Sequence, residues 1–446
     1  MTTPAVLPED LAGRLAAQIG HQLVSLRGEL SEWTATTGEG QPLEKHHSQV
    51  RSVLDVLGGY ADAAEAAVAT GPSAGRSSPA DVILDMHHVW DFFRSKLLLR
   101  SVPWHAGFLA AADELAWACY RPALDAAGRG SAAQGPSAEP PLVFLTTSAV
   151  PFAAKRGANF RDLLPRGGLY TREGATAAAR LPFPLIGLPW SHSGHLPGLL
   201  AIPHEVGHHI EDDLALTDTL HSCLRRAGVA DAWTGWLGEV FADVCGCLSV
   251  GEAYAGMLLD ALAATDSPSA TDAGPAAATA GAEDYPPPRL RAAVCLATLA
   301  RIDFAPAADG MREAWLDRWP AGTTPDDEAD RLVENLLTFD FPQLGGCLPQ
   351  ALQCAQLPQV RATAALLLSG LPTDRGDIRA VAAAAGLAFL WDPRRYQEIH
   401  AGEQALIDML NLRPKGPRAT MDDDEMARRR RAAGRAIFDM ISGNTA

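Results

Sequence analysis

Hydrophobic positions recur at helical spacing over most of the chain. In 11–30 and 81–100, apolar side chains return every three or four residues with polar ones between them. The pattern resumes beyond residue 300, in 331–339 and 378–391. The stretch PLVFLTTSAV, 141–150, is instead a short apolar run of the kind found in strands. We therefore expect a mainly α protein, of α+β type, with a small sheet.

Three segments interrupt these patterns. Residues 71–80 and 126–141 are rich in Gly, Pro and Ser, which is typical of linkers or loops. Residues 264–285 combine Ala, Ser, Thr, Asp and Gly with few large apolar side chains, which predicts a mobile surface insertion. We expect a helical N-terminal domain, a central domain and a helical C-terminal region, at 1–135, 136–300 and 301–446.

The stretch AIPHEVGHHIEDD, 201–213, concentrates histidines and carboxylates. His204 and His208 are four apart, so on a helix they share one face with Cβ atoms about 5–6 Å apart. Both can then bind one cation, while His209 points away. Glu205 lies beside the pair, where it could remove a proton from a water. Pro203 must open the helix or kink it, and both histidines follow it.

A second helix is predicted over 232–251, where large apolar residues repeat at helical spacing. Its only charged residues are Glu239 and Asp243, one turn apart. Burying two carboxylates is costly unless a cation or hydrogen-bond donors accompany them. The alternative is an exposed polar stripe on a half-buried helix.

Together, His204-Glu205-Val206-Gly207-His208 and Glu239-Val-Phe-Ala-Asp243 resemble the paired motifs of the gluzincins, zinc metallopeptidases with a thermolysin-like active-site plan. The resemblance implies one Zn²⁺ per chain and a zincin-like catalytic domain at 136–300, with a small sheet above two site helices. It implies His204, His208 and Glu239 as zinc ligands. Glu205 would be the general base, and Asp243 would orient a ligand histidine, most simply His204.

A third element is similar to one found in membrane-embedded gluzincins that process CAAX proteins and in their bacterial quality-control relatives. They carry a His-Pro pair with an arginine six residues after the histidine. Here Tyr285-Pro286 is followed by Arg291 at that distance, with Arg289 nearby. The resemblance implies that Tyr285 or Arg291 stabilises the developing oxyanion, a task that a phenol can perform. The alternative is a proline-rich turn into a helix with solvated arginines.

The segment LPFPLIGLPW, 181–190, precedes the first motif. Its short length, prolines and apolar residues suit an edge strand, which could pair with an extended substrate. They suit a buried connecting loop nearly as well. His192 and His195 follow in a loop, where one of them could touch substrate.

These features favour zinc-dependent hydrolysis of peptide bonds, with a protein or peptide as substrate and room for a regulatory protein partner. Two other classes stay open. One is a zinc hydrolase that acts on a non-peptide or modified-peptide amide. The other is a non-catalytic helical interaction protein in which zinc is structural, although structural sites normally have four protein ligands.

Composition and charge bear on the class of partner and on the cellular location. The net charge of −16 argues against nucleic acid as the main partner. No apolar run is long enough to cross a bilayer, and the N-terminus lacks the pattern of a secretory signal. The seven cysteines form no CxxC pair, as expected of reduced thiols in the cytoplasm. The basic run 428–431 follows an acidic DDDE, which predicts a solvated helix.

Overall fold

The computed structural model describes residues 11–70, 77–130, 139–164, 168–265, 285–318, 326–373, 375–414, 416 and 418. Helices dominate these residues, and three short strands form one sheet, which confirms the mainly α prediction. The expected insertion lies outside the described residues from 266 to 284, and the basic run at 428–431 also lies outside them.

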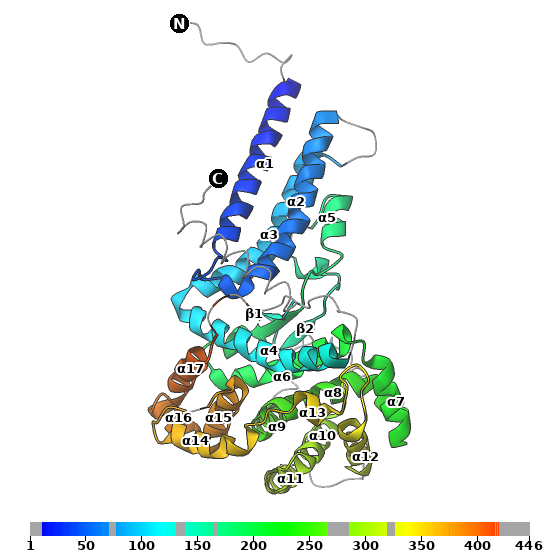
Figure 1. Cartoon of the computed structure of the whole chain (residues 1–446), viewed down its shortest axis with the longest axis vertical. Coiled ribbons are helices and arrows are strands. Elements are labelled where there is room, and N and C mark those ends of the chain that lie inside the picture. The colour runs from blue at the N-terminus through cyan, green and yellow to red at the C-terminus, as the bar shows by residue number, and fades with distance from the viewer. Residues whose placement is uncertain are drawn as a thin grey trace, which may run out of the picture.

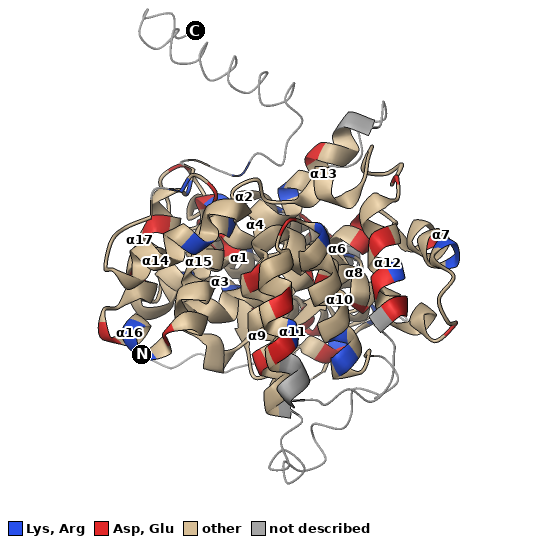
Figure 2. Cartoon of the chain, turned by 90° about the horizontal axis from the view of Figure 1, so that it is seen from below, with Lys and Arg blue, Asp and Glu red and all other residues tan. Residues whose placement is uncertain are grey.

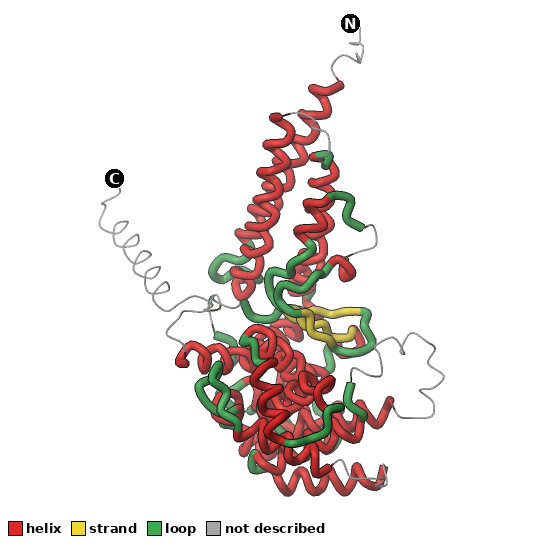
Figure 3. Tube along the Cα trace, turned by 90° about the vertical axis from the view of Figure 1, so that its right-hand side faces the viewer, coloured by secondary structure: helices red, strands yellow, loops and turns green. Residues whose placement is uncertain are grey.

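The N-terminal helices form an elongated stem (Figures 1 and 3). It consists of α1 (Leu11–Ala35), α2 (His47–Thr70) and α3 (Pro79–Leu98), which pack side by side, with the short 3-10 helix η2 (Glu44–His46) between α1 and α2. Their shared core includes Leu26, Leu57, Trp90 and Phe93. The helices expected at 11–30 and 81–100 are confirmed.

A buried polar network joins the stem to the rest of the molecule. Arg100, in the 3-10 helix η3 (Leu99–Ser101), donates to both carboxylate oxygens of Asp113 at 2.8 and 3.0 Å and to the Val143 carbonyl at 2.7 Å. Asp113 lies on α4 (Pro103–Gly130) and Val143 lies on the first strand. The predicted start of a linker at residue 126 is wrong, because α4 continues to Gly130 and Ala126 is buried on its packed face.

The sheet has the order β1-β3-β2, formed by β1 (Leu142–Thr146), β2 (Phe152–Ala154) and β3 (Leu185–Pro189). β1 runs parallel to β3, and β2 runs antiparallel to it. β1 confirms the strand expected within 141–150. The expectation that 181–190 contains an edge strand is wrong, because β3 is central and all five of its residues are buried. Most of the prolines that suggested an edge lie before β3, and Pro189 is its last residue.

The sheet lies between two cores. Along β1, Val143 and Leu145 join the core shared with α4 and α6, whereas Leu142 and Phe144 join the core shared with the stem. Alternate side chains of a strand point to opposite faces, so one short strand contributes to both cores. The segments around the sheet include η4 (Arg161–Leu163), α5 (Arg172–Ala177), η5 (Trp190–His192) and η6 (Leu196–Ala201). The predicted division of the chain into regions 1–135, 136–300 and 301–446 stays a prediction.

The remaining helices pack below the sheet (Figure 1). Those that position the candidate site are α6 (Ile202–Asp213), α8 (Trp233–Val250), α9 (Glu252–Thr265) and α10 (Pro288–Arg301). Around them lie α7 (Thr217–Ala227), α11 (Ala305–Arg318), α12 (Asp326–Thr338), α13 (Leu348–Leu352), η8 (Leu357–Gln359), α14 (Val360–Leu368), α15 (Ile378–Trp391), α16 (Pro393–Glu398) and α17 (Ala401–Asn411). The predicted helices over 331–339 and 378–391 correspond to α12 and α15.

The surface carries more acidic than basic side chains over the lower helices. Seen from below, acidic segments stand out on α9, α11 and α12 (Figure 2). In the described part of the chain, no helix combines the length and the apolar character needed to cross a bilayer. All seven cysteines are free thiols, six of them buried.

Candidate metal centre

The first motif lies on α6. Pro203 occupies the first turn of the helix, where its missing N–H removes no helical hydrogen bond, so it opens α6 rather than kinking it. His204 and His208 follow one turn apart on one face. Their ring centroids are 4.9 Å apart and the rings are nearly perpendicular, with an angle of 88° between their planes.

The second motif reaches the first because α6 and α8 approach closely at Gly207. A methyl group in place of the Gly207 hydrogen would lie 2.8 Å from the Ala242 Cα and 3.1 Å from the Cys245 Cβ, closer than side chains tolerate. The position just before His208 in the first motif therefore has a packing role. It lets α8 bring Glu239 opposite the two histidines.

Three side chains converge at this point. The Nε2 atom of His204 lies 3.3 Å from Oε2 of Glu239, and the Nε2 atom of His208 lies 3.3 Å from Oε1 of the same carboxylate. One ligand atom from each residue lies within 4.8 Å of the others. In the described part of the chain, this is the group of His, Cys, Asp and Glu side chains that could hold a metal ion.

The donor set and its spacing fit a cation. Two donor atoms that are each about 2.0–2.1 Å from a tetrahedral Zn²⁺ are about 3.3 Å apart, close to both contacts of Glu239. Oε2 of Glu239 is buried and has no hydrogen-bond partner, although the His204 ring is close. A buried carboxylate oxygen without a donor is costly, and a cation would satisfy it.

The other ring nitrogen of His204, Nδ1, contacts Asp243 and Tyr254. Nδ1 of His204 lies 2.9 Å from Oδ1 of Asp243 and 3.0 Å from the Tyr254 hydroxyl, which itself donates to that Asp243 oxygen at 2.5 Å. Both neighbours present oxygen to Nδ1, so they favour the tautomer with the proton there. That tautomer leaves the lone pair of Nε2 directed toward Glu239.

Arg291 completes this arrangement from α10. Its Nε and Nη2 atoms donate to Oδ2 and Oδ1 of Asp243 at 2.9 and 2.5 Å, and its Nη2 atom lies 3.9 Å from Glu239. The sequence alternative of a solvated arginine is wrong for Arg291, because only 13% of its side chain is exposed. Two of its nitrogens are directed at Asp243, and its expected contact with a substrate oxyanion stays a prediction.

Ionisation follows from these contacts. Burial lowers the pKa of His204, but its contacts with Asp243 and Glu239 outweigh burial and raise the pKa to about 9. Burial raises the pKa of Asp243, but Arg291 and then His204 bring it down to about 2. Burial also raises the pKa of Glu239, but the two histidines outweigh burial and hold the pKa of that carboxyl well below its usual range. Both carboxylates are therefore ionised at neutral pH, as a metal ligand and a partner of a ligand histidine must be.

Glu205 is a buried carboxylate beside the cluster. Its pKa is raised, chiefly because burial disfavours the charged form, and partly because Glu239 is close, while His204 and His208 oppose the rise. Among the described side chains it has no hydrogen-bond partner, so its carboxylate is available to a small molecule at the cluster. His208 is the most exposed of the three candidate ligands, so the centre opens toward solvent on that side.

The other residues considered from the sequence lie in different settings. Tyr285, just before α10, is 47% exposed, and the described contacts of the three candidate ligands do not include it. Its role as an oxyanion donor stays a prediction. His209 points to the opposite side of α6, as expected, with Nε2 3.2 Å from the Leu185 carbonyl of β3. In the loop before α6, the His195 ring packs edge-on against Phe389.

Tyr254 is the site residue that the sequence did not identify. Its ring stacks nearly parallel to the His204 ring, with an angle of 16° between the planes and 6.2 Å between centroids. The ring reaches this position across Gly246, where a methyl group would lie 2.7 Å from it. The available signal was weak, because a lone tyrosine in a largely apolar helix usually packs in a core.

No protein-family model, curated protein or solved structure matches this chain. The assignment of a function therefore depends on the residues of the centre itself.

Proposed function

We propose that the protein is a zinc-dependent metallopeptidase of gluzincin type with a zincin-like core. His204, His208 and Glu239 would bind the ion, one per chain. The observation that carries the proposal is the position of Glu239, whose two carboxylate oxygens each lie 3.3 Å from the Nε2 atom of one histidine. A bound zinc would polarise the substrate carbonyl and lower the pKa of a water molecule toward 7.

The chain's own residues supply the proton transfers and the alignment. Glu205 accepts a proton from the attacking water and returns it to the leaving amine, a role favoured by its raised pKa and by its lack of a competing hydrogen bond. Asp243 and Tyr254 hold His204 by Nδ1, and Arg291 holds Asp243. Asp243, Tyr254 and Arg291 are thus positioning residues that fix the direction of Nε2.

The number of ligands supports a catalytic rather than a structural metal. The candidate group in the described residues contains three side chains, and a structural zinc normally has four protein ligands. An open fourth position is what a hydrolase needs for water and substrate. The partial exposure of His208 gives that position access to solvent.

A peptide substrate is proposed because the two motifs resemble those of the gluzincins. The sheet contacts α6 on the side of His209, which points away from the two candidate ligand histidines, so strand addition at the sheet is not part of the proposal. Amide hydrolysis of a modified or non-peptide substrate would use the same proton transfers and stays an alternative.

The test is a comparison of the wild type with Glu205→Gln in a cell lysate. Both proteins are loaded with zinc, their metal content is measured, and new protein N-termini are labelled and identified by mass spectrometry. We expect new termini with the wild type only, with equal zinc in both proteins. Equal cleavage by the variant would contradict the role of Glu205. Absence of new termini with fully loaded wild type would contradict peptide-bond hydrolysis and favour the amide alternative.

A further inference from the structure

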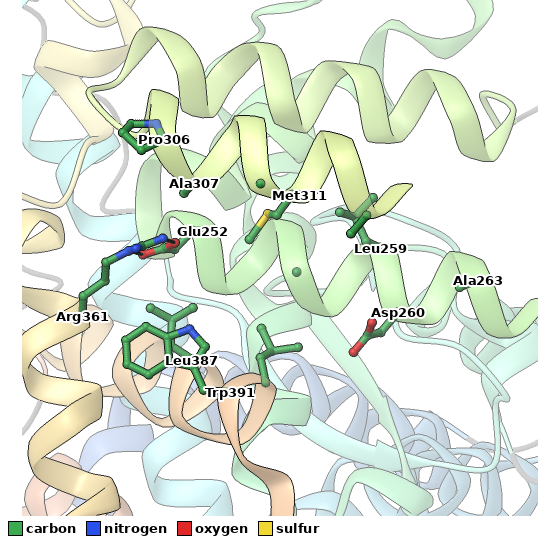
Figure 4. Close-up of a pocket in the computed structure, with 14 residues that line it drawn as sticks. Glu252, Leu259, Asp260, Ala263, Pro306, Ala307, Met311, Arg361, Leu387 and Trp391 are labelled. Carbon is green, nitrogen blue, oxygen red and sulfur yellow. Dashed lines mark hydrogen bonds and ion pairs between the residues drawn. The ribbon is translucent and has the colours of Figure 1, made fainter. Parts of the chain in front are cut away.

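A second concave site lies away from the metal centre, among α9, α11, α14 and α15 (Figure 4). Its volume is about 510 Å³, within the usual range for small-molecule sites, about 300–1,000 Å³. Most of its lining is apolar, including Leu259, Met311, Leu387, Leu390 and Trp391. Trp391 is 45% exposed, so part of its indole ring is available to a ligand.

The helix α9 separates this pocket from the metal centre. Glu252, Gly256 and Asp260 recur every four residues and line the pocket. Tyr254, two residues from both Glu252 and Gly256, lies on the other side of α9 and contacts His204. The pocket is therefore distinct from the site of the proposed reaction.

Two carboxylates line the pocket, and only one is neutralised by the chain. Glu252 is buried and receives hydrogen bonds from the Nε and Nη2 atoms of Arg361 at 2.6 and 2.5 Å. Asp260, two turns further along α9, has no ion-pair or hydrogen-bond partner in the described part of the chain. The Asp260 side chain is exposed at the rim of the pocket, and partial burial raises the pKa of its carboxyl.

The neighbouring helix α11 adds two acidic side chains near the pocket, Asp309 and Glu313, beside one arginine, Arg312. Acidic segments of α9 and α11 are visible from below (Figure 2). An unpaired carboxylate, a partly exposed indole ring and an apolar lining are together complementary to an ammonium or guanidinium group on a hydrocarbon body.

We propose that this pocket binds a small organic cation with an apolar body. Its charged group pairs with Asp260, and its hydrocarbon or aromatic part packs on Trp391, Met311 and the leucines of α15. The same chemistry is found in a free amine and in a basic side chain of a peptide. This proposal does not depend on the proposed function of the metal centre.

Calorimetric titration of the whole chain of 446 residues tests the proposal with three probes of matched shape: phenethylamine, phenethyl alcohol and hydrocinnamate. We expect the amine to bind about threefold to fivefold more tightly than the neutral alcohol, because an ion pair with an exposed carboxylate is partly screened by water. Hydrocinnamate should bind most weakly. A blocked Phe-Lys dipeptide and its norleucine counterpart show whether a peptide side chain serves as well as a free amine.

Two variants locate the binding. Asp260→Asn should abolish the preference for the amine over the alcohol, whereas the control Asp309→Asn removes an exposed carboxylate of α11 that does not line the pocket and should retain it. Gly310 lines the pocket, and a methyl group there would meet open space. Gly310→Leu should therefore fill the pocket and lower the affinity for all probes without disturbing the fold.

Equal affinity of the wild type for phenethylamine and phenethyl alcohol would overturn the proposal. So would an amine preference that survives Asp260→Asn, or one that Asp309→Asn removes equally. Undiminished binding of phenethylamine to a folded Gly310→Leu variant would place the cation elsewhere and overturn it too.

Discussion

Gly207 of α6 packs directly against Ala242 of α8, and a methyl group on Gly207 would lie 2.8 Å from the Ala242 Cα. The contact falls between His204 and His208 on one helix and between Glu239 and Asp243 on the other. The spacing of the two helices at this point therefore sets the distance between the histidine nitrogens and the Glu239 carboxylate.

Gly207→Ala should separate the two helices. We expect the free energy of unfolding to fall by about 1–3 kcal/mol, as for other overpacked cores. The affinity for zinc should fall as well, because Glu239 moves away from His204. Chemical unfolding and zinc titration measure the two effects.

Gly235→Ala is the matched control for this prediction. Gly235 is an exposed glycine of α8 with open space around it. Alanine there should leave zinc affinity unchanged and the free energy of unfolding unchanged or raised by up to about 1 kcal/mol. An equal loss of affinity in both variants would contradict the role of the Gly207 contact.

Asp243 and Tyr254 should contribute to metal affinity without contacting the ion. Asp243→Ala is expected to weaken zinc binding by about 10–100-fold, because His204 loses the acceptor that orients its ring. Tyr254→Phe keeps the ring that stacks on His204 and removes only the hydroxyl, so a smaller loss of about tenfold is expected. Competition with a chromophoric zinc chelator measures both.

Tyr120→Phe provides a control for the loss of a buried hydroxyl. Tyr120 on α4 donates to Asp213 at the far end of α6. Its replacement should lower stability but leave zinc affinity as in the wild type. If Tyr254→Phe and Tyr120→Phe both retain full affinity, Tyr254 is a packing residue and nothing more.

The sequence predicted the parts of the site that local geometry determines. His204 and His208 are one turn apart on one helix, and Glu239 and Asp243 stand out because the rest of their helix is uncharged. Tyr254 is 50 residues from His204 in sequence, and only the packing of α9 over Gly246 brings it there. No local pattern encodes that contact. The central position of β3 was missed for a similar reason, because the pairing partners of a strand depend on the whole sheet.

Lys96 gives a prediction about pH that is independent of the metal centre. Its ammonium group lies 3.4 Å from the centre of the Phe92 ring, and burial lowers its pKa to about 8 from the ordinary value of 10.5, although Asp91 opposes the shift. Between these values the unfolded chain holds a proton that the folded chain has lost. The free energy of unfolding should therefore rise with pH across this range.

Lys96→Met isolates this effect from other titrating groups. As the pH rises from about 7.5 to about 9.5, the free energy of unfolding of the wild type should rise by about 2 kcal/mol relative to that of the variant, which lacks the titrating ammonium group. Urea unfolding of both proteins at each pH gives the difference. A difference that does not change with pH would mean that Lys96 titrates normally in the folded protein.

Glu239→Gln tests whether the carboxylate is a ligand. The amide keeps the size of the side chain but is a much poorer zinc ligand, so most of the bound metal should be lost on dialysis. Glu211→Gln, on α6 but outside the cluster, should keep the metal content of the wild type. Zinc retained at one equivalent by the Glu239 variant would remove this residue from the ligand set.

The central claim is that His204, His208 and Glu239 together bind one zinc ion. Anomalous diffraction at the zinc absorption edge, from crystals of the zinc-loaded protein, tests it most directly. We predict one strong peak per chain, about 2.0–2.2 Å from the Nε2 atoms of both histidines and from a Glu239 oxygen. A peak bound by other residues, or no peak at these three side chains in protein that contains zinc, would contradict the account.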